Sequence, residues 1–144
     1  MSTDISCKIY RNGLPEDARK IRDTVFKKEQ GFQNEFDDTD EIAAHIVLYG
    51  KAGTPIAVCR VFPSENPETY IIGRLAVKKE YRGQHIGSAV LGAAEQYIKE
   101  QHGKKAALHA QCQAGAFYRS LGYQEYGEIQ DDEGCPHIWM KKLL

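Results

Sequence analysis

Residues 82–88 (Arg-Gly-Gln-His-Ile-Gly-Ser) place a basic side chain and two glycines between an apolar run and a strongly amphipathic stretch. Glycine lets a backbone approach a ligand closely or adopt positive φ. The first N–H groups of a helix have no partner within the helix and are aligned with its dipole, so they stabilise an anion such as pyrophosphate. Arg82, with Lys78 or Lys79 before it, adds positive charge. The spacing indicates either a phosphate-binding loop or an ordinary turn between a strand and a helix.

Two common phosphate motifs do not explain this stretch. A Walker A loop needs Gly-Lys-Ser/Thr at the start of the helix, whereas the chain has Gly87-Ser88-Ala89 without a lysine. The GxGxxG fingerprint of dinucleotide-binding domains is also absent. The loop is therefore neither a P-loop nor a Rossmann fingerprint.

The segment Arg82 to Gly87 resembles the Arg/Gln-x-x-Gly-x-Gly/Ala pyrophosphate loop of the GNAT superfamily of N-acetyltransferases. His85 stands where that loop most often has its first glycine. Residues 74–77 (Arg-Leu-Ala-Val) resemble the splayed central strand of the superfamily, and residues 116–123 resemble its helix-and-turn motif. The segments that resemble the ElaA/YjcF-like branch more narrowly are residues 25–30, His45, residues 110–111 and residues 134–140. The matches follow one another in the family's order along nearly the whole chain.

The resemblance implies transfer of an acetyl group from acetyl-CoA to the primary amine of an unidentified small molecule or peptide, by direct attack in a ternary complex. It implies no metal. The residues expected to bind the cosubstrate acetyl-CoA are Leu75, Ala76, Val77, Arg82, Gly83, Gln84, His85, Ile86, Gly87, Ser88, Phe117 and Tyr118.

Acetyl transfer needs a base or a water chain for the amine proton, a donor for the thioester oxygen and an acid for the leaving thiolate. Matched to the family motif, Tyr118 is the expected acid, and a backbone amide near Leu75 to Val77 could be the oxygen's donor. His45 and His137 are expected either to carry the proton or to be hydrogen-bonded structural histidines, and His109 has the same two interpretations.

Two further polar residues are expected on the acceptor side. Glu29 stands in the Glu-Gln motif at the end of the first helix, where it either binds the acceptor substrate or is a solvated charge. Gln111 either bonds the acceptor or satisfies a strand edge.

The elements that must position these residues follow from hydrophobic periodicity. Helices are predicted from Pro15 to Gly31, over residues 86–101 and over residues 114–121. The acidic stretch from Asn34 to Glu41 is predicted to be a solvated, partly helical loop. Strands are predicted over residues 5–11, 45–49, 56–62, 70–77, 106–111, 123–129 and 137–141. This order indicates the α/β (α+β) class: a GNAT fold with a mixed, mostly antiparallel central sheet of six to seven strands flanked by helices, whose splayed central strand leads into the pyrophosphate loop.

Composition limits the remaining choices. The chain has 144 residues, 19 Lys plus Arg and 20 Asp plus Glu, for a net charge of −1. This size predicts a single domain over residues 1–144, and the charge balance argues against binding nucleic acid or an anionic membrane. Four widely spaced cysteines, without a signal sequence or membrane span, favour the cytoplasm.

Two alternative functions and the oligomeric state stay open at this stage. A CoA-binding regulatory module without catalysis is one, because no general base is unambiguous. A zinc site from His109, Cys112, Cys135 and His137 is another, although the ligand spacings are unusual. The terminal strands of such sheets often pair between copies, so a homodimer is one of the expected states.

Overall fold

The computed structural model describes residues 5–144, so residues 1–4 of the predicted domain lie outside the described part. Every predicted element is present, with shifted ends. The elements are β1 (Ser6–Tyr10), α1 (Glu16–Arg22) continued by a π-helix (Asp23–Glu29), α2 (Thr39–Ile42), β2 (Ala44–Tyr49), β3 (Pro55–Pro63), β4 (Thr69–Val77), α3 (Ile86–Glu100), β5 (Lys105–Gln111), α4 (Gly115–Ser120), β6 (Gln124–Asp132) and β7 (Cys135–Leu143).

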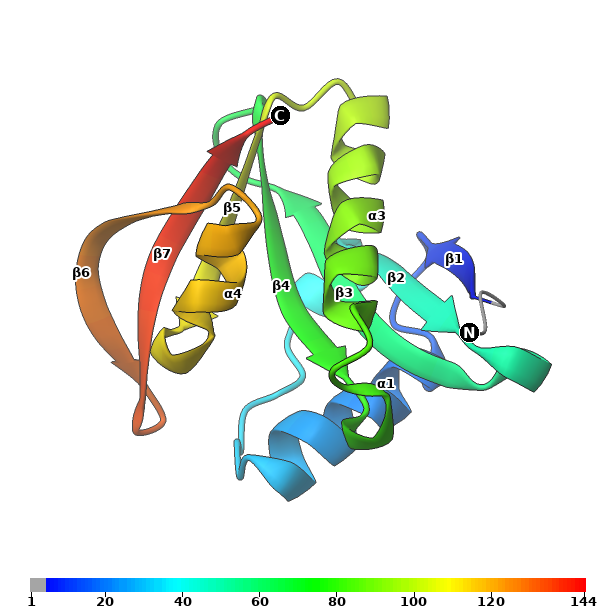
Figure 1. Cartoon of the computed structure of the whole chain (residues 1–144). Coiled ribbons are helices and arrows are strands. Elements are labelled where there is room, and N and C mark those ends of the chain that lie inside the picture. The colour runs from blue at the N-terminus through cyan, green and yellow to red at the C-terminus, as the bar shows by residue number, and fades with distance from the viewer. Residues whose placement is uncertain (1–4) are drawn as a thin grey trace.

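The strands form one seven-stranded sheet in the order β1-β2-β3-β4-β5-β7-β6 (Figure 1). All neighbours are antiparallel except β4 and β5, which are parallel. This parallel pair is short, because only Thr69–Ile71 pair with Lys105–Ala107. Beyond Ile71 the two strands diverge, so β4 is the predicted splayed strand. The sheet thus confirms the predicted mixed, mostly antiparallel fold with flanking helices.

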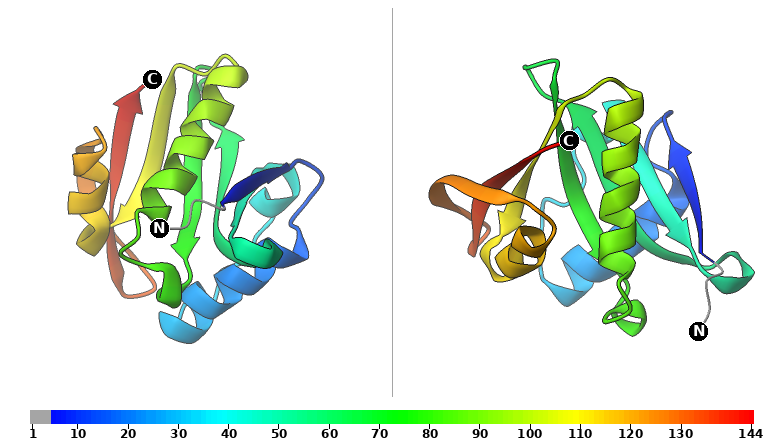
Figure 2. Two further views of the ribbon diagram at one scale, coloured as in Figure 1. Left: turned by 45° about the vertical axis from the view of Figure 1, so that its right-hand side comes forward. Right: turned by 45° about the horizontal axis from the view of Figure 1, so that its top comes forward.

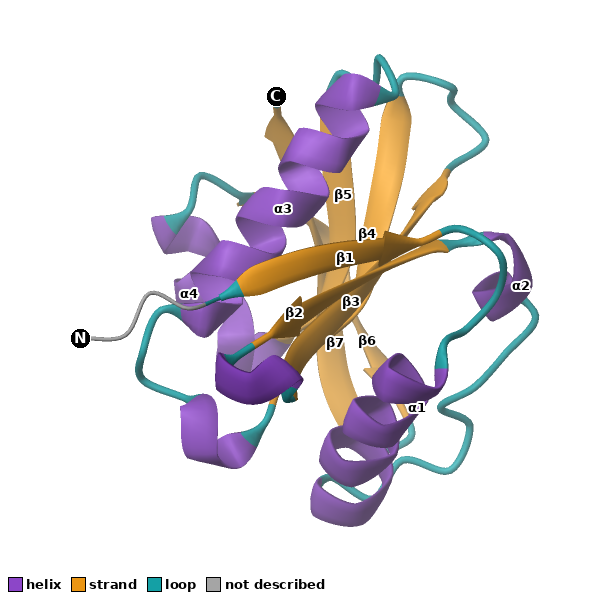
Figure 3. Ribbon diagram, turned by 90° about the vertical axis from the view of Figure 1, so that its right-hand side faces the viewer, coloured by secondary structure: helices purple, strands orange, loops and turns teal. Residues whose placement is uncertain are grey.

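Helices cover both faces of the sheet, as Figures 2 and 3 show. The first core joins α3 and α4 to one face, and Val90, Leu91 and Ile98 of α3 are fully or almost fully buried there. The second core joins α1 and the π-helix to the other face through Ile21 and Val25. The apolar residues of α3 recur at helical spacing, which is why this helix lies flat on the sheet.

The terminal hairpin is longer than predicted. Strand pairing between β6 and β7 runs to Asp132 and Cys135, which leaves only Glu133 and Gly134 in the turn. Their φ values are 52° and 82°. Positive φ at both central residues matches the right-handed twist of the strands, so a two-residue turn continues the ladder to its end.

The acidic stretch is only in part the solvated, partly helical loop that its charge predicts. Asp37, Asp38 and Glu41 are exposed and Thr39–Ile42 form a short helix, but two acids are buried. Glu35 and Asp40 are only 4% and 5% exposed, and α2 includes Asp40. The fully buried Arg22 donates to Glu35 at 2.8 Å and to Asp40 at 2.7 Å, and Arg60 donates to Asp37 at 2.6 Å and to Asp40 at 2.9 Å. The burial of Glu35 and Asp40 was not predicted, because arginines distant in the sequence neutralise these two acids and local sequence does not reveal that pairing.

Within the described residues, no helix is both long enough and apolar enough to span a membrane.

Candidate active site

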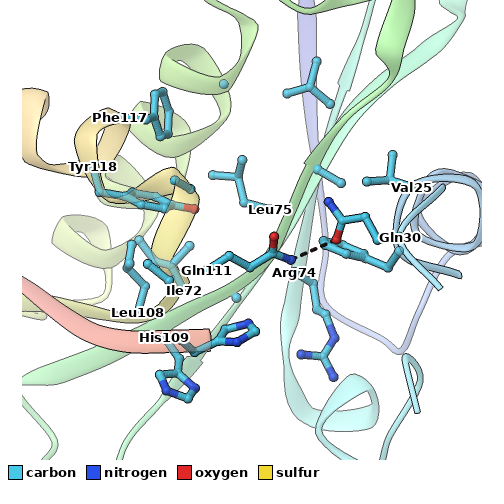
Figure 4. Close-up of a pocket in the computed structure, with 18 of the residues that line it drawn as sticks. Val25, Gln30, Ile72, Arg74, Leu75, Leu108, His109, Gln111, Phe117 and Tyr118 are labelled. Atoms are coloured by element: carbon cyan, nitrogen blue, oxygen red, sulfur yellow. Dashed lines mark hydrogen bonds between the residues drawn. The ribbon is translucent and has the colours of Figure 1, made fainter. Parts of the chain in front are cut away.

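A cavity of about 380 Å³ lies where β4 and β5 diverge. Its walls come from β4, the start of α3, β5, α4, the π-helix and the turn between β6 and β7. Figure 4 shows Tyr118, Leu75 and His109 lining this space. Residues Ile72–Val77 have no strand partner on the β5 side, so the cavity meets an unpaired backbone edge there.

The loop before α3 has the backbone that a phosphate cradle requires. Gly83 and His85 both have positive φ, 77° and 62°. The first N–H of α3 to reach a carbonyl is that of Ala89, which bonds the His85 carbonyl at 3.1 Å. No side chain caps this helix. The amides of residues 86–88 therefore have no hydrogen-bond partner within residues 5–144 and can receive an anion.

Gly87 serves close packing in the same loop. A Cβ added at Gly87 would lie 3.2 Å from Cζ of Phe117. The missing side chain therefore lets α4 approach the first turn of α3. Both residues line the cavity, as does Tyr118, whose ring centroid is 5.0 Å from that of Phe117.

Arg82 is held by the protein itself. Its Nε donates to the Val77 carbonyl at 2.9 Å, and its two Nη atoms donate to the two carboxylate oxygens of Glu29 at 2.6 and 2.9 Å. The hydrogen bonds from Arg82 lower the pKa of Glu29, and the same pair raises the pKa of Arg82, so both groups are charged. Glu29, expected to bind the acceptor, instead pairs with Arg82 of the loop before α3 and is not among the residues that line the cavity.

Arg74 is a cavity residue that sequence analysis did not assign to the site. The register between β3 and β4 shifts there, because Val58 pairs with Ala76 while Arg60 pairs with Gly73. The bulge gives Arg74 a φ of 53° and turns its side chain toward Glu35, 3.1 Å from Nε to the carboxylate. The sequence did contain a signal for this residue, because Arg74 is a charged residue within an otherwise mostly apolar predicted strand.

Tyr118 lines the cavity from α4. Burial, together with the nearby Cys59, raises the pKa of Tyr118. Like an ordinary tyrosine, whose pKa is about 10, Tyr118 is protonated at neutral pH, so its hydroxyl is available as a hydrogen-bond donor.

Two histidines, His109 and His137, lie side by side in the lining of the cavity. The rings of His109 and His137 are 5.0 Å apart, and His109 stacks on Trp139 at 4.7 Å. The Nδ1 atom of His137 is 2.8 Å from the Cys135 carbonyl. Burial and the proximity of His137 lower the pKa of His109, so its imidazole is neutral at pH 7.

Gln111 lines the cavity and forms a hydrogen bond across it to Gln30, at the end of the π-helix. Its Nε2 donates to Oε1 of Gln30 at 2.9 Å, the contact drawn in Figure 4. This bond joins β5 to the segment that packs on β4.

His45, Gln84 and Ser88 are not among the residues that line the cavity. His45 is fully buried, and its Nε2 is 2.9 Å from the Asp40 carbonyl. Burial lowers the pKa of His45, so the ring is neutral. These contacts match the interpretation of His45 as a hydrogen-bonded structural histidine, not the interpretation of it as a proton carrier.

The described residues contain no cluster of three or more His, Cys, Asp or Glu side chains arranged to hold a metal ion. The four proposed zinc ligands fall within this part of the chain, and all four cysteines are free thiols.

Comparison with known proteins agrees with this geometry. A family model described as an acetyltransferase (GNAT) domain matches residues 13–144. A Bacillus subtilis (strain 168) protein is 35% identical over 130 residues, which cover 87% of this chain and 86% of that protein. The crystal structure of a Lactobacillus plantarum protein has a TM-score of 0.86 to this chain at 30% sequence identity. The crystal structure of Escherichia coli ElaA has a TM-score of 0.84 at 25% sequence identity. Each match covers 96% of this chain and 99% of the other chain.

The splayed sheet and the family match define an acyl-CoA-dependent N-acetyltransferase. The chain belongs to the GNAT family of acetyltransferases, and its relatives include ElaA. The family and the fold expected from the sequence are thereby confirmed.

Proposed function

We propose that this protein transfers the acetyl group of acetyl-CoA to the primary amine of a small molecule or peptide, by direct attack in a ternary complex. The observation that carries the proposal is the uncapped amino end of α3, which opens onto the cavity between β4 and β5. Free amides suit a pyrophosphate, and the unpaired edge of β4 suits the amide-containing arm of CoA.

The residues present fit acetyl-CoA in a definite order. The amides of residues 86–88 would hold the pyrophosphate, and residues 75–77 would run beside the arm. Bound acetyl-CoA supplies the thioester that the amine attacks. A backbone N–H at the free edge of β4 would stabilise the charge that develops on the thioester oxygen. Tyr118, which is protonated at neutral pH, would hydrogen-bond the departing thiolate and supply its proton.

His137 is the proposed acceptor of the amine proton. A carbonyl oxygen can only accept a hydrogen bond, so the contact with Cys135 O fixes the proton on Nδ1 of His137. The lone pair is then on Nε2, the nitrogen that a base needs. His137 is 7% exposed and lines the cavity.

Calorimetry of acetyl-CoA binding with wild type and Arg82→Ala tests the cofactor assignment. We expect wild type to bind and the variant to bind more weakly, because one cavity cation is removed. Absence of binding by wild type near neutral pH overturns the proposal.

Turnover of an amine panel separates catalysis from binding alone. We expect Tyr118→Phe and His137→Gln each to lower turnover by about 10²–10⁴-fold, the usual contribution of a positioned acid or base. Unchanged turnover of Tyr118→Phe, when chemistry limits the rate, removes it as the acid. Acetyl-CoA binding without transfer to any amine would instead favour the regulatory module.

A further inference from the structure

One stretch of chain, residues 29–35, borders the cavity beside the proposed base, because the ring centroids of Phe32 and His137 are 6.4 Å apart. We call this side of the cavity the acceptor end and residues 29–35 the crossing segment. Both of its ends are fixed: Glu29 pairs with Arg82 of the cofactor loop, and Glu35 pairs with the buried Arg22. Near its start Gln30 bonds Gln111 across the cavity, as Figure 4 shows. The segment therefore connects the two halves of the splayed sheet.

Glu133 makes a second attachment to this segment from the tip of the β6–β7 hairpin. Its carboxylate accepts the backbone N–H of Gln33 at 2.8 Å and that of Asn34 at 3.0 Å. These two bonds lower the pKa of Glu133, so the carboxylate is ionised at neutral pH. Glu133 and Asn34 both line the cavity, and Gln33 follows Phe32, the residue whose ring meets that of His137.

The backbone of Glu133 is unusual for its residue type. Its φ is 52° and that of Gly134 is 82°, a turn that favours Asn-Gly or Asp-Gly. A glutamate held in the left-handed region costs free energy that asparagine largely avoids. A strained residue that persists points to a role for its side chain. Here the side chain is one methylene longer than asparagine, and it uses that length to reach the crossing segment.

We propose that Glu133 is a clasp that closes the acceptor end and makes the enzyme select small free amines over the amines of polypeptides. This inference rests on the proposed acetyl transfer. A lysine or terminal amine of a polypeptide must bring its flanking backbone past the clasped segment to reach the thioester. A small amine needs only part of the cavity of about 380 Å³. Glu133 is therefore a residue that determines specificity, separate from the acid and the base.

The variant Glu133→Asn separates the clasp from the turn. Asparagine suits the left-handed turn but is too short to hold both amides, so the hairpin stays folded while the clasp opens. Glu133→Gln keeps the length and loses the charge, and Glu128→Gln on the exposed strand β6 is the matched control for charge alone.

The first measurement compares kcat/KM for a panel of small diamines and amino sugars with that for a lysine-containing peptide. We expect wild type to favour small amines by about 100-fold or more, the scale of steric discrimination at a closed site. Glu133→Asn should lower this ratio about tenfold, Glu133→Gln should lower it less, and Glu128→Gln should leave it unchanged. Equal use of peptide and small amines by wild type overturns the proposal.

The second measurement is amide hydrogen exchange at Gln33 and Asn34, which needs no acceptor. Both amides should exchange about tenfold faster in Glu133→Asn, while the melting temperature and acetyl-CoA affinity stay those of wild type. Unchanged exchange shows that the clasp is not closed in solution and overturns the inference. No transfer to any amine counts against the proposed function, whereas transfer without discrimination counts against the clasp alone.

Discussion

Single residues in the loop before α3 act on a proposed binding surface made of backbone amides. The charge of Arg82 is paired with Glu29, and its Nε donates to the Val77 carbonyl, so this charge is balanced before any phosphate binds. His85 holds the left-handed conformation that a glycine would adopt more easily. The shape of the loop is therefore set by its backbone conformation, and the charge of its arginine is neutralised by Glu29.

Removing the carboxylate of Glu29 should tighten acetyl-CoA binding. The substitution Glu29→Gln frees the charge of Arg82 and removes a negative group near the phosphates, so we expect affinity to rise about three- to tenfold at low salt. The gain should shrink as salt screens this exposed pair. Calorimetry at two ionic strengths measures both effects, with Glu128→Gln as the control. Weaker binding would show instead that Glu29 holds Arg82 in its binding geometry.

His85→Gly should leave the fold and the cofactor site nearly unchanged. Glycine relieves the left-handed strain of about 1 kcal/mol, and the greater freedom of the unfolded chain cancels much of that gain. We expect the free energy of unfolding in urea to change by less than about 1 kcal/mol. A loss of acetyl-CoA affinity beyond about tenfold would show that the imidazole itself contacts the cosubstrate.

At the scale of elements, a buried ion network fastens the acidic segment to the sheet. Asp40 accepts from Arg22 of α1 and Arg60 of β3, and Glu35 accepts from Arg22. The network ends at Arg74 in the bulge of β4, which lines the cavity. It therefore connects the second core to the cavity.

Removing the charge of Asp40 should destabilise the protein strongly. Asp40→Asn leaves two buried arginines short of a partner, and breaking a buried pair costs about 3–5 kcal/mol. Urea unfolding at neutral pH measures this loss. Asp38→Asn, on the neighbouring exposed residue, is the control and should change little. A loss below about 1 kcal/mol would show that water or Asp37 replaces the missing charge.

The same network predicts the acid sensitivity of the fold. Burial raises the pKa of Asp40, but the hydrogen bonds and charges of Arg22 and Arg60 outweigh it and lower that pKa from 3.8 to about 2. A carboxyl whose pKa is lower in the folded state stabilises the fold above its unfolded pKa and loses that contribution as pH falls through the folded pKa. We expect wild type to lose stability between pH 4 and pH 2, and Asp40→Asn to show a flatter profile over that range. Equal slopes would assign the acid sensitivity elsewhere.

At the scale of the molecule, the site exists because the sheet opens. β4 and β5 share only three paired positions, so strands β1–β4 and strands β5–β7 are two parts of the sheet joined along a short edge. The cavity occupies that opening, and its lining residues come from both sides. A ligand bound there would contact both parts of the sheet and so add interactions between them that the free protein lacks.

Acetyl-CoA should therefore stabilise the whole fold. At a free concentration 100 times its Kd, a ligand that binds only the native state adds about 2.7 kcal/mol. For a domain of this size we expect the melting temperature to rise by about 5–10 °C. Differential scanning fluorimetry with acetyl-CoA measures the shift, and adenine without phosphates is the control. No shift at saturating acetyl-CoA would contradict the proposed site.

The sequence by itself determined the position of the glycine-containing loop before α3 and most elements of the fold. Glycines, the amino end of α3 and the apolar period of its residues are contiguous, and backbone conformation and helix formation depend on such neighbours. Only the tertiary structure decided which charges meet. Glu29 and Arg82 are 53 positions apart, Gln30 and Gln111 are 81 apart, and Gln33 and Glu133 are 100 apart. No local pattern encodes these pairs, because each depends on where the sheet brings distant segments together.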